Sequence, residues 1–132
     1  MSWKSVHDFE TLVSSWFGAK YGIAVDSCTH GVELCLRYKN VKKLSIPKRT
    51  YLSIPSLSHK LGIPLEWRDE DWKEYYEIGN SGIYDAAVLW RENSYIPNSL
   101  MCLSFQFQKH LSLGRGGLIL TDSKEHAHTL CR

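Results

Sequence analysis

Polar and aromatic side chains that could bind a ligand stand at or just after the ends of four short apolar segments. Cys28 and Thr29 follow residues 23–25, Tyr51 follows 44–47, Asp85 lies in 83–89, and Ser104 and Lys109 lie in and after 100–107. The first pair falls at a helix start, where unpaired amides and the helix dipole attract an anion. A carboxylate in an apolar strand needs a partner, because burying it unpaired is costly. Each residue also has an ordinary structural explanation: a helix cap, a packed ring, a salt bridge or a surface lysine.

Together, these side chains meet the needs of one cofactor, pyridoxal 5'-phosphate. Its phosphate binds at a helix N-terminus, and its pyridine ring lies against an aromatic side chain such as Tyr51. A carboxylate such as Asp85 keeps the ring nitrogen protonated, and a lysine such as Lys109 forms a Schiff base. We therefore predict a pyridoxal-phosphate site with Lys109 as its catalytic residue.

Short apolar strands alternate with amphipathic helices along the chain. Strands are predicted at 23–25, 44–47, 65–67, 83–89, 100–107 and 118–120; helices are predicted from 5 to about 21, after 28, from 53 to 61, and from 123 onward, still running at 132. This alternation favours a doubly wound α/β sheet, in which ligands bind at the carboxyl ends of strands. The segment 69–80 has only weak periodicity and predicts no element.

Length and composition limit the class of protein. A chain of 132 residues with 43% hydrophobic residues suits one domain. Its 16 basic and 14 acidic residues are interspersed, which disfavours nucleic-acid binding. We expect no membrane span and no secretion signal, and hence a cytoplasmic protein with reduced cysteines. No metal site is predicted, because the four cysteines lack zinc-site spacing and His126 and His128, two apart on a helix, point in different directions.

Five motifs, in order along nearly the whole chain, resemble those of the DegT/StrS-type sugar aminotransferases, which have the aspartate-aminotransferase fold (fold type I). Residues 27–29 resemble the Ser-Gly-Thr phosphate turn, and 47–51 the Pro-x-x-Thr-aromatic segment whose ring stacks on the cofactor. Residues 83–87 resemble Ile-Glu-Asp-Ala-Ala, whose Asp pairs with the pyridine nitrogen. Ser104 precedes Lys109 by five residues, as the phosphate-binding Ser precedes the Schiff-base Lys. Residues 113–122 resemble the glycine-rich hairpin and strand that follow.

The resemblance implies a three-layer, doubly wound, mostly parallel sheet of about six strands. The strand after Gly116 is expected to run antiparallel to its neighbours. Residues 1–132 would form a single shortened large domain without the C-terminal small domain. The resemblance also implies a homodimer that transfers an amino group from an amino acid such as glutamate to a keto sugar, which is expected to be linked to a nucleotide.

The chain departs from the family pattern at several positions. Cys28 replaces Gly and is expected to crowd the approach of the phosphate to the backbone. Arg115 replaces a Glu, and Val88 replaces a polar residue that contacts the cofactor's phenolic oxygen. Residues 67–83 are too few for the strand and helix that the family has there. Two alternatives therefore stay open: a non-catalytic remnant serving as a module, and a relative that catalyses sugar dehydration.

Overall fold

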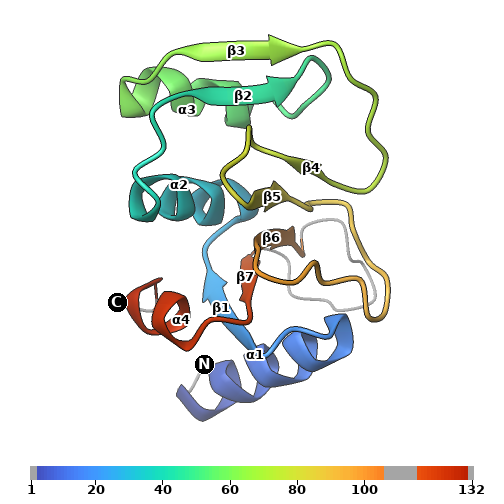
Figure 1. Ribbon diagram of the computed structural model, residues 1–132. Helices are drawn as coiled ribbons and strands as arrows, with labels where there is room; N and C mark the ends of the chain where they lie inside the picture. Colours follow the sequence, from blue (N-terminus) through green and yellow to red (C-terminus); the bar gives the residue numbers. More distant parts are fainter. Residues whose placement is uncertain (1–2, 106–115, 131–132) are drawn as a thin grey trace.

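The computed structural model describes residues 3–105 and 116–130; within them, helices and strands alternate as far as the third strand, and further strands then follow one another before the last helix (Figure 1). In chain order they are α1 (Trp3–Phe17), β1 (Tyr21–Val25), α2 (Cys28–Tyr38), β2 (Leu44–Pro47), α3 (Ser53–Leu61), β3 (Leu65–Arg68), β4 (Tyr76–Glu77), β5 (Ile83–Asp85), β6 (Leu100–Ser104), β7 (Gly117–Thr121) and α4 (Lys124–Leu130). The predicted bounds of β2 and α3 are confirmed. The predicted end of the last helix, Arg132, lies outside the described residues.

Two apolar runs end earlier than the sequence predicts. Helix α1 stops at Phe17 because Gly18 adopts a φ of +88°, a left-handed conformation that ends helices. Strand β5 stops at Asp85, since the following residues form a turn in which the Leu89 amide donates to the Ala86 carbonyl over 3.0 Å. The apolar run to Leu89 therefore ends in a turn, buried except at Val88, and not in a strand; a short apolar run does not distinguish the two.

The strands form two sheets, and most of their pairings are antiparallel. The larger sheet has the order β1-β7-β6-β5-β4, and the smaller pairs β2 with β3. Strand β7 runs antiparallel to both β1 and β6, which confirms the orientation expected for the strand after Gly116. The α/β class is confirmed, but the expected single, mostly parallel sheet of about six strands is wrong: the described residues form seven strands.

The antiparallel pairing of β4 with β5 explains part of this difference. A parallel crossover needs a dozen or more residues, whereas an antiparallel hairpin needs only a few. Between Glu77 and Ile83 the chain has room only for a tight turn, which the Ile78 amide closes on the Ile83 carbonyl over 2.8 Å. The segment 69–80, for which the sequence predicts no element, thus supplies an edge strand to the larger sheet.

Helices cover both faces of the larger sheet, and the core is divided accordingly. On one face, Val32 and Leu36 of α2 and Leu130 of α4 pack with Cys102 of β6. On the other face, Phe17 of α1 lies in a second cluster with Met101, Leu103, Leu118 and Leu120. This burial of alternate residues on opposite faces is the pattern of a central strand in a three-layer fold.

The pairing directions place several strand ends at one edge of the sheet. Because β7 is antiparallel to both β1 and β6, and β5 is parallel to β6, strands β1, β5 and β6 end at the edge where β7 begins. Helix α2 starts at this same edge, directly after β1. Within the described residues no helix combines the length and apolar character needed to cross a membrane.

Candidate functional site

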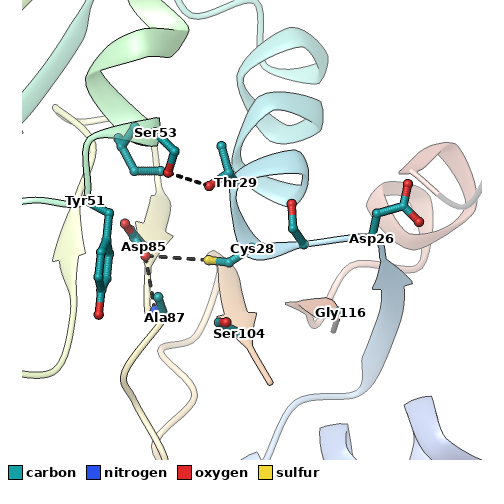
Figure 2. Close-up of a pocket in the computed structure, with 11 residues that line it drawn as sticks. Asp26, Cys28, Thr29, Tyr51, Ser53, Asp85, Ala87, Ser104 and Gly116 are labelled. Carbon is teal, nitrogen blue, oxygen red and sulfur yellow. Dashed lines mark hydrogen bonds between the residues drawn. The ribbon is translucent and has the colours of Figure 1, made fainter. Parts of the chain in front are cut away.

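A cavity of about 560 Å³ opens at the edge of the sheet where β1, β5 and β6 end (Figure 2). It is lined by Asp26, Ser27, Cys28, Thr29, Tyr51, Ser53, Ile54, Asp85, Ala87, Ser104 and Gly116. Five of the six site residues predicted from the sequence are therefore brought together from four separate parts of the chain. The sixth, Lys109, lies outside the described residues, as does Arg115.

The start of helix α2 forms one side of this cavity. Ser27 is its N-cap, with extended backbone, and its hydroxyl accepts a hydrogen bond from the His30 amide over 3.1 Å. The amides of Cys28 and Thr29 belong to the first turn, where N–H groups have no acceptor within the helix. This side of the cavity can therefore bind an anion through backbone amides and the helix dipole.

A second helix start meets the first. The hydroxyl oxygens of Thr29 and Ser53 lie 2.8 Å apart and are hydrogen-bonded, which joins the first turn of α2 to that of α3 (Figure 2). Helix α3 has Leu52 at its N-cap and no side-chain hydrogen bond there. Two positive helix ends therefore converge on one side of the cavity.

Strand β7 packs tightly beneath the start of α2. A Cβ atom placed on Gly117 would lie 2.7 Å from both the Cys28 nitrogen and the Leu103 oxygen, and 2.8 Å from the Ser27 carbonyl carbon. All three neighbours are backbone atoms, which cannot rotate away. The absence of a side chain at Gly117 thus allows the turn that carries the α2 amides to sit directly on the sheet.

Asp85, at the end of β5, is the buried charge of the site, with only 2% of its surface exposed. Its Oδ2 accepts a hydrogen bond from the Tyr76 hydroxyl over 2.6 Å, and its Oδ1 accepts one from the Ala87 amide over 3.1 Å. Oδ1 also accepts from the Cys28 thiol at 3.6 Å (Figure 2). Burial raises the pKa of Asp85 above its ordinary value, and these three hydrogen bonds act in the opposite direction.

The side chain of Cys28 points toward Asp85, as Figure 2 shows. Its sulfur also lies 3.4 Å from the Cys102 carbonyl oxygen, so the thiol is held between β5 and β6. Burial, followed by the nearby Asp85 charge, raises the pKa of the Cys28 thiol well above its ordinary value. The thiol is therefore a protonated donor at neutral pH, and its bulk is directed at the carboxylate.

Tyr51 and Ser104 line the cavity at different depths. Tyr51, in the loop before α3, is 42% exposed, so one part of its ring is open to solvent. Ser104 is the last residue of β6 and is buried, with 8% exposed. Val88, which replaces a polar residue of the family pattern, is not among the residues that line the cavity.

Sequence reasoning missed several residues of the site. Ser53 begins α3 and could have been found as a hydroxyl at a second helix start. Ala87 and Gly116 contribute mainly backbone, which leaves no side-chain signal. Tyr76, which holds Asp85, lies in the segment of weak periodicity, and its partnership with Asp85 depends on the β4–β5 pairing.

The described residues fit pyridoxal phosphate. The cavity volume falls in the range of small-molecule sites, about 300–1,000 Å³. One side offers helix amides and hydroxyls for a phosphate, and the other offers a buried carboxylate for a protonated ring nitrogen. Because Gly117 has no side chain, the helix start that carries these amides lies directly against the sheet. The amine for a covalent link would have to come from outside the described residues.

Comparison with known proteins bears on the family and on the fold. Residues 1–60 match the model of the DegT/DnrJ/EryC1/StrS aminotransferase family, so the resemblance noted from the motifs is confirmed over that part of the chain. No curated protein sequence matches the chain significantly.

Solved structures of pyridoxal-phosphate-dependent enzymes share the fold. A putative PLP-dependent aminotransferase from Bacillus cereus superposes with a TM-score of 0.76 at 16% identity, covering 96% of this chain and 48% of the other. The sugar aminotransferase CalS13 from Micromonospora echinospora superposes with a TM-score of 0.75 at 12% sequence identity, covering 96% of this chain and 48% of the other. A GDP-4-keto-6-deoxymannose-3-dehydratase superposes with a TM-score of 0.71 at 16% sequence identity, covering 95% of this chain and 46% of the other. The fold-type I class is thus confirmed, and the chain spans less than half the length of these structures.

Proposed function

We propose that this chain, whose first 60 residues match the DegT/DnrJ/EryC1/StrS family and whose fold is that of pyridoxal-phosphate-dependent sugar-modifying enzymes, binds pyridoxal phosphate and takes part in amino transfer. The donor would be an amino acid such as glutamate and the acceptor a keto sugar linked to a nucleotide. The observation that carries this proposal is the convergence of Cys28, Thr29, Tyr51, Asp85 and Ser104 on one cavity.

The phosphate would bind at the start of α2. The amides of Cys28 and Thr29 are oriented by the Ser27 cap, and the helix dipole adds a favourable charge interaction. The Ser104 hydroxyl, at the end of β6, would donate to the same group. These contacts bind and orient the ligand without any change in protonation.

The ring would lie between Tyr51 and the sheet, with its nitrogen toward Asp85. Pyridoxal phosphate supplies an electron sink when its ring nitrogen is protonated. The role of Asp85 is to accept the hydrogen bond from that N–H and to favour its protonated state, because an anion next to a cation stabilises both. The exposed part of the Tyr51 ring would shield one face of the site from water.

Lys109 is assigned from the sequence alone as the amine that holds the cofactor and later moves a proton as a general base. A general base must be neutral, and burial next to the ligand would lower the pKa of a lysine in that direction. A second copy of the chain would complete the site in a homodimer. Dehydration of a sugar is the second candidate, because a dehydratase shares the fold.

The test starts with purified protein and added pyridoxal phosphate. We expect a visible absorbance band that borohydride abolishes, leaving one pyridoxyl group on Lys109 that mass spectrometry of the digested protein locates. Lys109→Ala should abolish this labelling, whereas Lys20→Ala, at an exposed lysine beside β1, should not. Absence of labelling in the wild-type protein would favour the non-catalytic module.

A second experiment separates the two activities. Bound cofactor exposed to glutamate should change its spectrum and release 2-oxoglutarate, and Asp85→Asn should suppress this reaction by weakening ring protonation. The protein would be a dehydratase, and the proposal of amino transfer would fail, if two results came together: 2-oxoglutarate is released but no amino group reaches a keto nucleotide sugar, and the sugar loses water instead.

A further inference from the structure

The hydroxyl of Tyr76 makes the shortest contact with Asp85. The two side chains are each 2% exposed, and the hydroxyl oxygen lies 2.6 Å from Oδ2. Tyr76 is the partner of Asp85 in the β4–β5 register, so both side chains stand on the same face of the hairpin. The hairpin thus fixes this pair in place.

Most acceptor positions of the Asp85 carboxylate are already occupied. An ionised carboxylate has about four lone-pair positions on its two oxygens. Oδ1 receives the Ala87 amide and the Cys28 thiol, and Oδ2 receives Tyr76. The hydrogen bonds from the described residues therefore leave one position open, on Oδ2, and Asp85 lines the cavity.

We propose that Tyr76 is a positioning residue: it orients the Asp85 carboxylate so that its one remaining acceptor position receives the N–H of a protonated nitrogen heterocycle. This proposal rests on the proposed function and adds a residue to the same site. Tyr76 lies in the segment 67–83, which is too short for the strand and helix of the family pattern, and it reaches Asp85 through the β4–β5 pairing.

The electrostatic surroundings of Asp85 make this contact important. Among the described residues, the titratable groups that face it are Tyr76 from β4, Cys28 from α2 and Cys102 from β6. Burial is the first cause that raises the pKa of Tyr76 and of Cys28, and hydrogen bonding to Cys35 is the first that raises the pKa of Cys102, so all three stay uncharged at neutral pH. Among the described residues, no cation lowers the pKa of Asp85. Among these residues, only uncharged hydrogen-bond donors act against the effect of burial on the pKa of Asp85, and Tyr76 has the largest effect of them.

The matched variants are Tyr76→Phe and Tyr95→Phe. Phenylalanine at 76 keeps the ring that packs on Trp72, with centroids 5.0 Å apart, so the fold should be retained. Tyr95 is the control, because its hydroxyl donates to the Ser99 carbonyl over the same 2.6 Å but lies outside the cavity. In the cofactor-free protein, carbon-13 NMR of the Asp85 carboxyl, assigned with Asp85→Asn, should show its titration displaced to higher pH in Tyr76→Phe only.

The ligand is tested with 4-deoxypyridoxine 5'-phosphate, which has no aldehyde and therefore needs no lysine. Its comparison compound carries C–H in place of the ring nitrogen. The wild-type protein should prefer the nitrogen compound on the order of tenfold, as expected for a hydrogen bond to a charged group. Tyr76→Phe should reduce this preference several-fold, and Tyr95→Phe should keep it.

The outcomes separate this proposal from the function on which it rests. The proposal is overturned if Asp85 titrates at the same pH in Tyr76→Phe as in the wild-type protein. It is also overturned if the titration is displaced but Tyr76→Phe prefers the compound with the ring nitrogen as strongly as the wild-type protein does. If the wild-type protein binds neither compound, the proposed function fails together with the ligand role of Tyr76, while the titration still decides whether Tyr76 controls Asp85. A displaced titration with reduced preference supports the proposal.

Discussion

Replacing Gly117 by alanine would force a methyl group into the contact between β7 and the start of α2. The added Cβ would lie 2.7 Å from the Cys28 nitrogen and the Leu103 oxygen, whereas ordinary contact begins near 3.4 Å. The backbone must therefore move by about 0.7 Å, either by shifting β7 from β6 or by lifting the first turn of α2. Overpacking typically lowers the free energy of unfolding by about 1–3 kcal/mol. Because the added methyl group would meet backbone on both sides, we expect a loss of about 3 kcal/mol for Gly117→Ala.

Gly31→Ala is the matched control, since Gly31 lies within α2 itself. Its added Cβ would lie 3.3 Å from Ile119 Cγ1 and 3.4 Å from Val25 Cγ2, both atoms of side chains that can adjust. Alanine also favours the helix over glycine by about 1 kcal/mol. We therefore expect Gly31→Ala to leave the free energy of unfolding within about 1 kcal/mol of the wild-type value.

Urea denaturation, followed by circular dichroism, measures both variants. With a slope of about 1–3 kcal/mol per molar urea, a loss of about 3 kcal/mol should lower the midpoint of Gly117→Ala by about 1–3 M relative to Gly31→Ala. If it folds, Gly117→Ala should also bind pyridoxal phosphate more weakly, because the amides of the α2 start are displaced. Equal urea midpoints for the two variants would refute the argument that the missing side chain at Gly117 lets the start of α2 lie against the sheet.

Three further substitutions test the cap, the core and the buried carboxyl. Ser27→Ala should lower the free energy of unfolding by about 1 kcal/mol in urea denaturation, because it removes the cap on the His30 amide; no change would mean that the cap is dispensable. Phe17→Ala should cost about 3–5 kcal/mol, measurable as a large drop in melting temperature, because Phe17 is fully buried against the sheet. Burial raises the pKa of Asp85 above 3.8, so the folded protein holds this proton more tightly than the unfolded chain. The stability of the wild-type protein relative to Asp85→Asn should thus fall as pH rises from 3.8 through the raised pKa, and a rise in urea titrations over that range would contradict the assignment.

Local sequence patterns were sufficient for much of the fold. Helix α3 and strand β2 have the predicted bounds, because a proline in the first turn and a glycine after the last residue mark α3, and a short apolar run ending in proline marks β2. The order of strands and helices also predicted that residues after strands would meet at one edge of a sheet. Cys28, Thr29, Tyr51, Asp85 and Ser104 do line one cavity there.

Pairing between segments that are distant in the sequence determined the remaining features of the fold and of the site. The sequence determined which residues stand at strand ends and helix starts, because turn residues and apolar periodicity act over a few neighbours. Only the tertiary structure decided that β4 pairs antiparallel with β5, that Tyr76 therefore reaches Asp85, and that Cys28, 57 positions away, reaches the same carboxyl. Such contacts depend on strand register and on the packing of α2 over the sheet, which no short stretch of sequence encodes by itself.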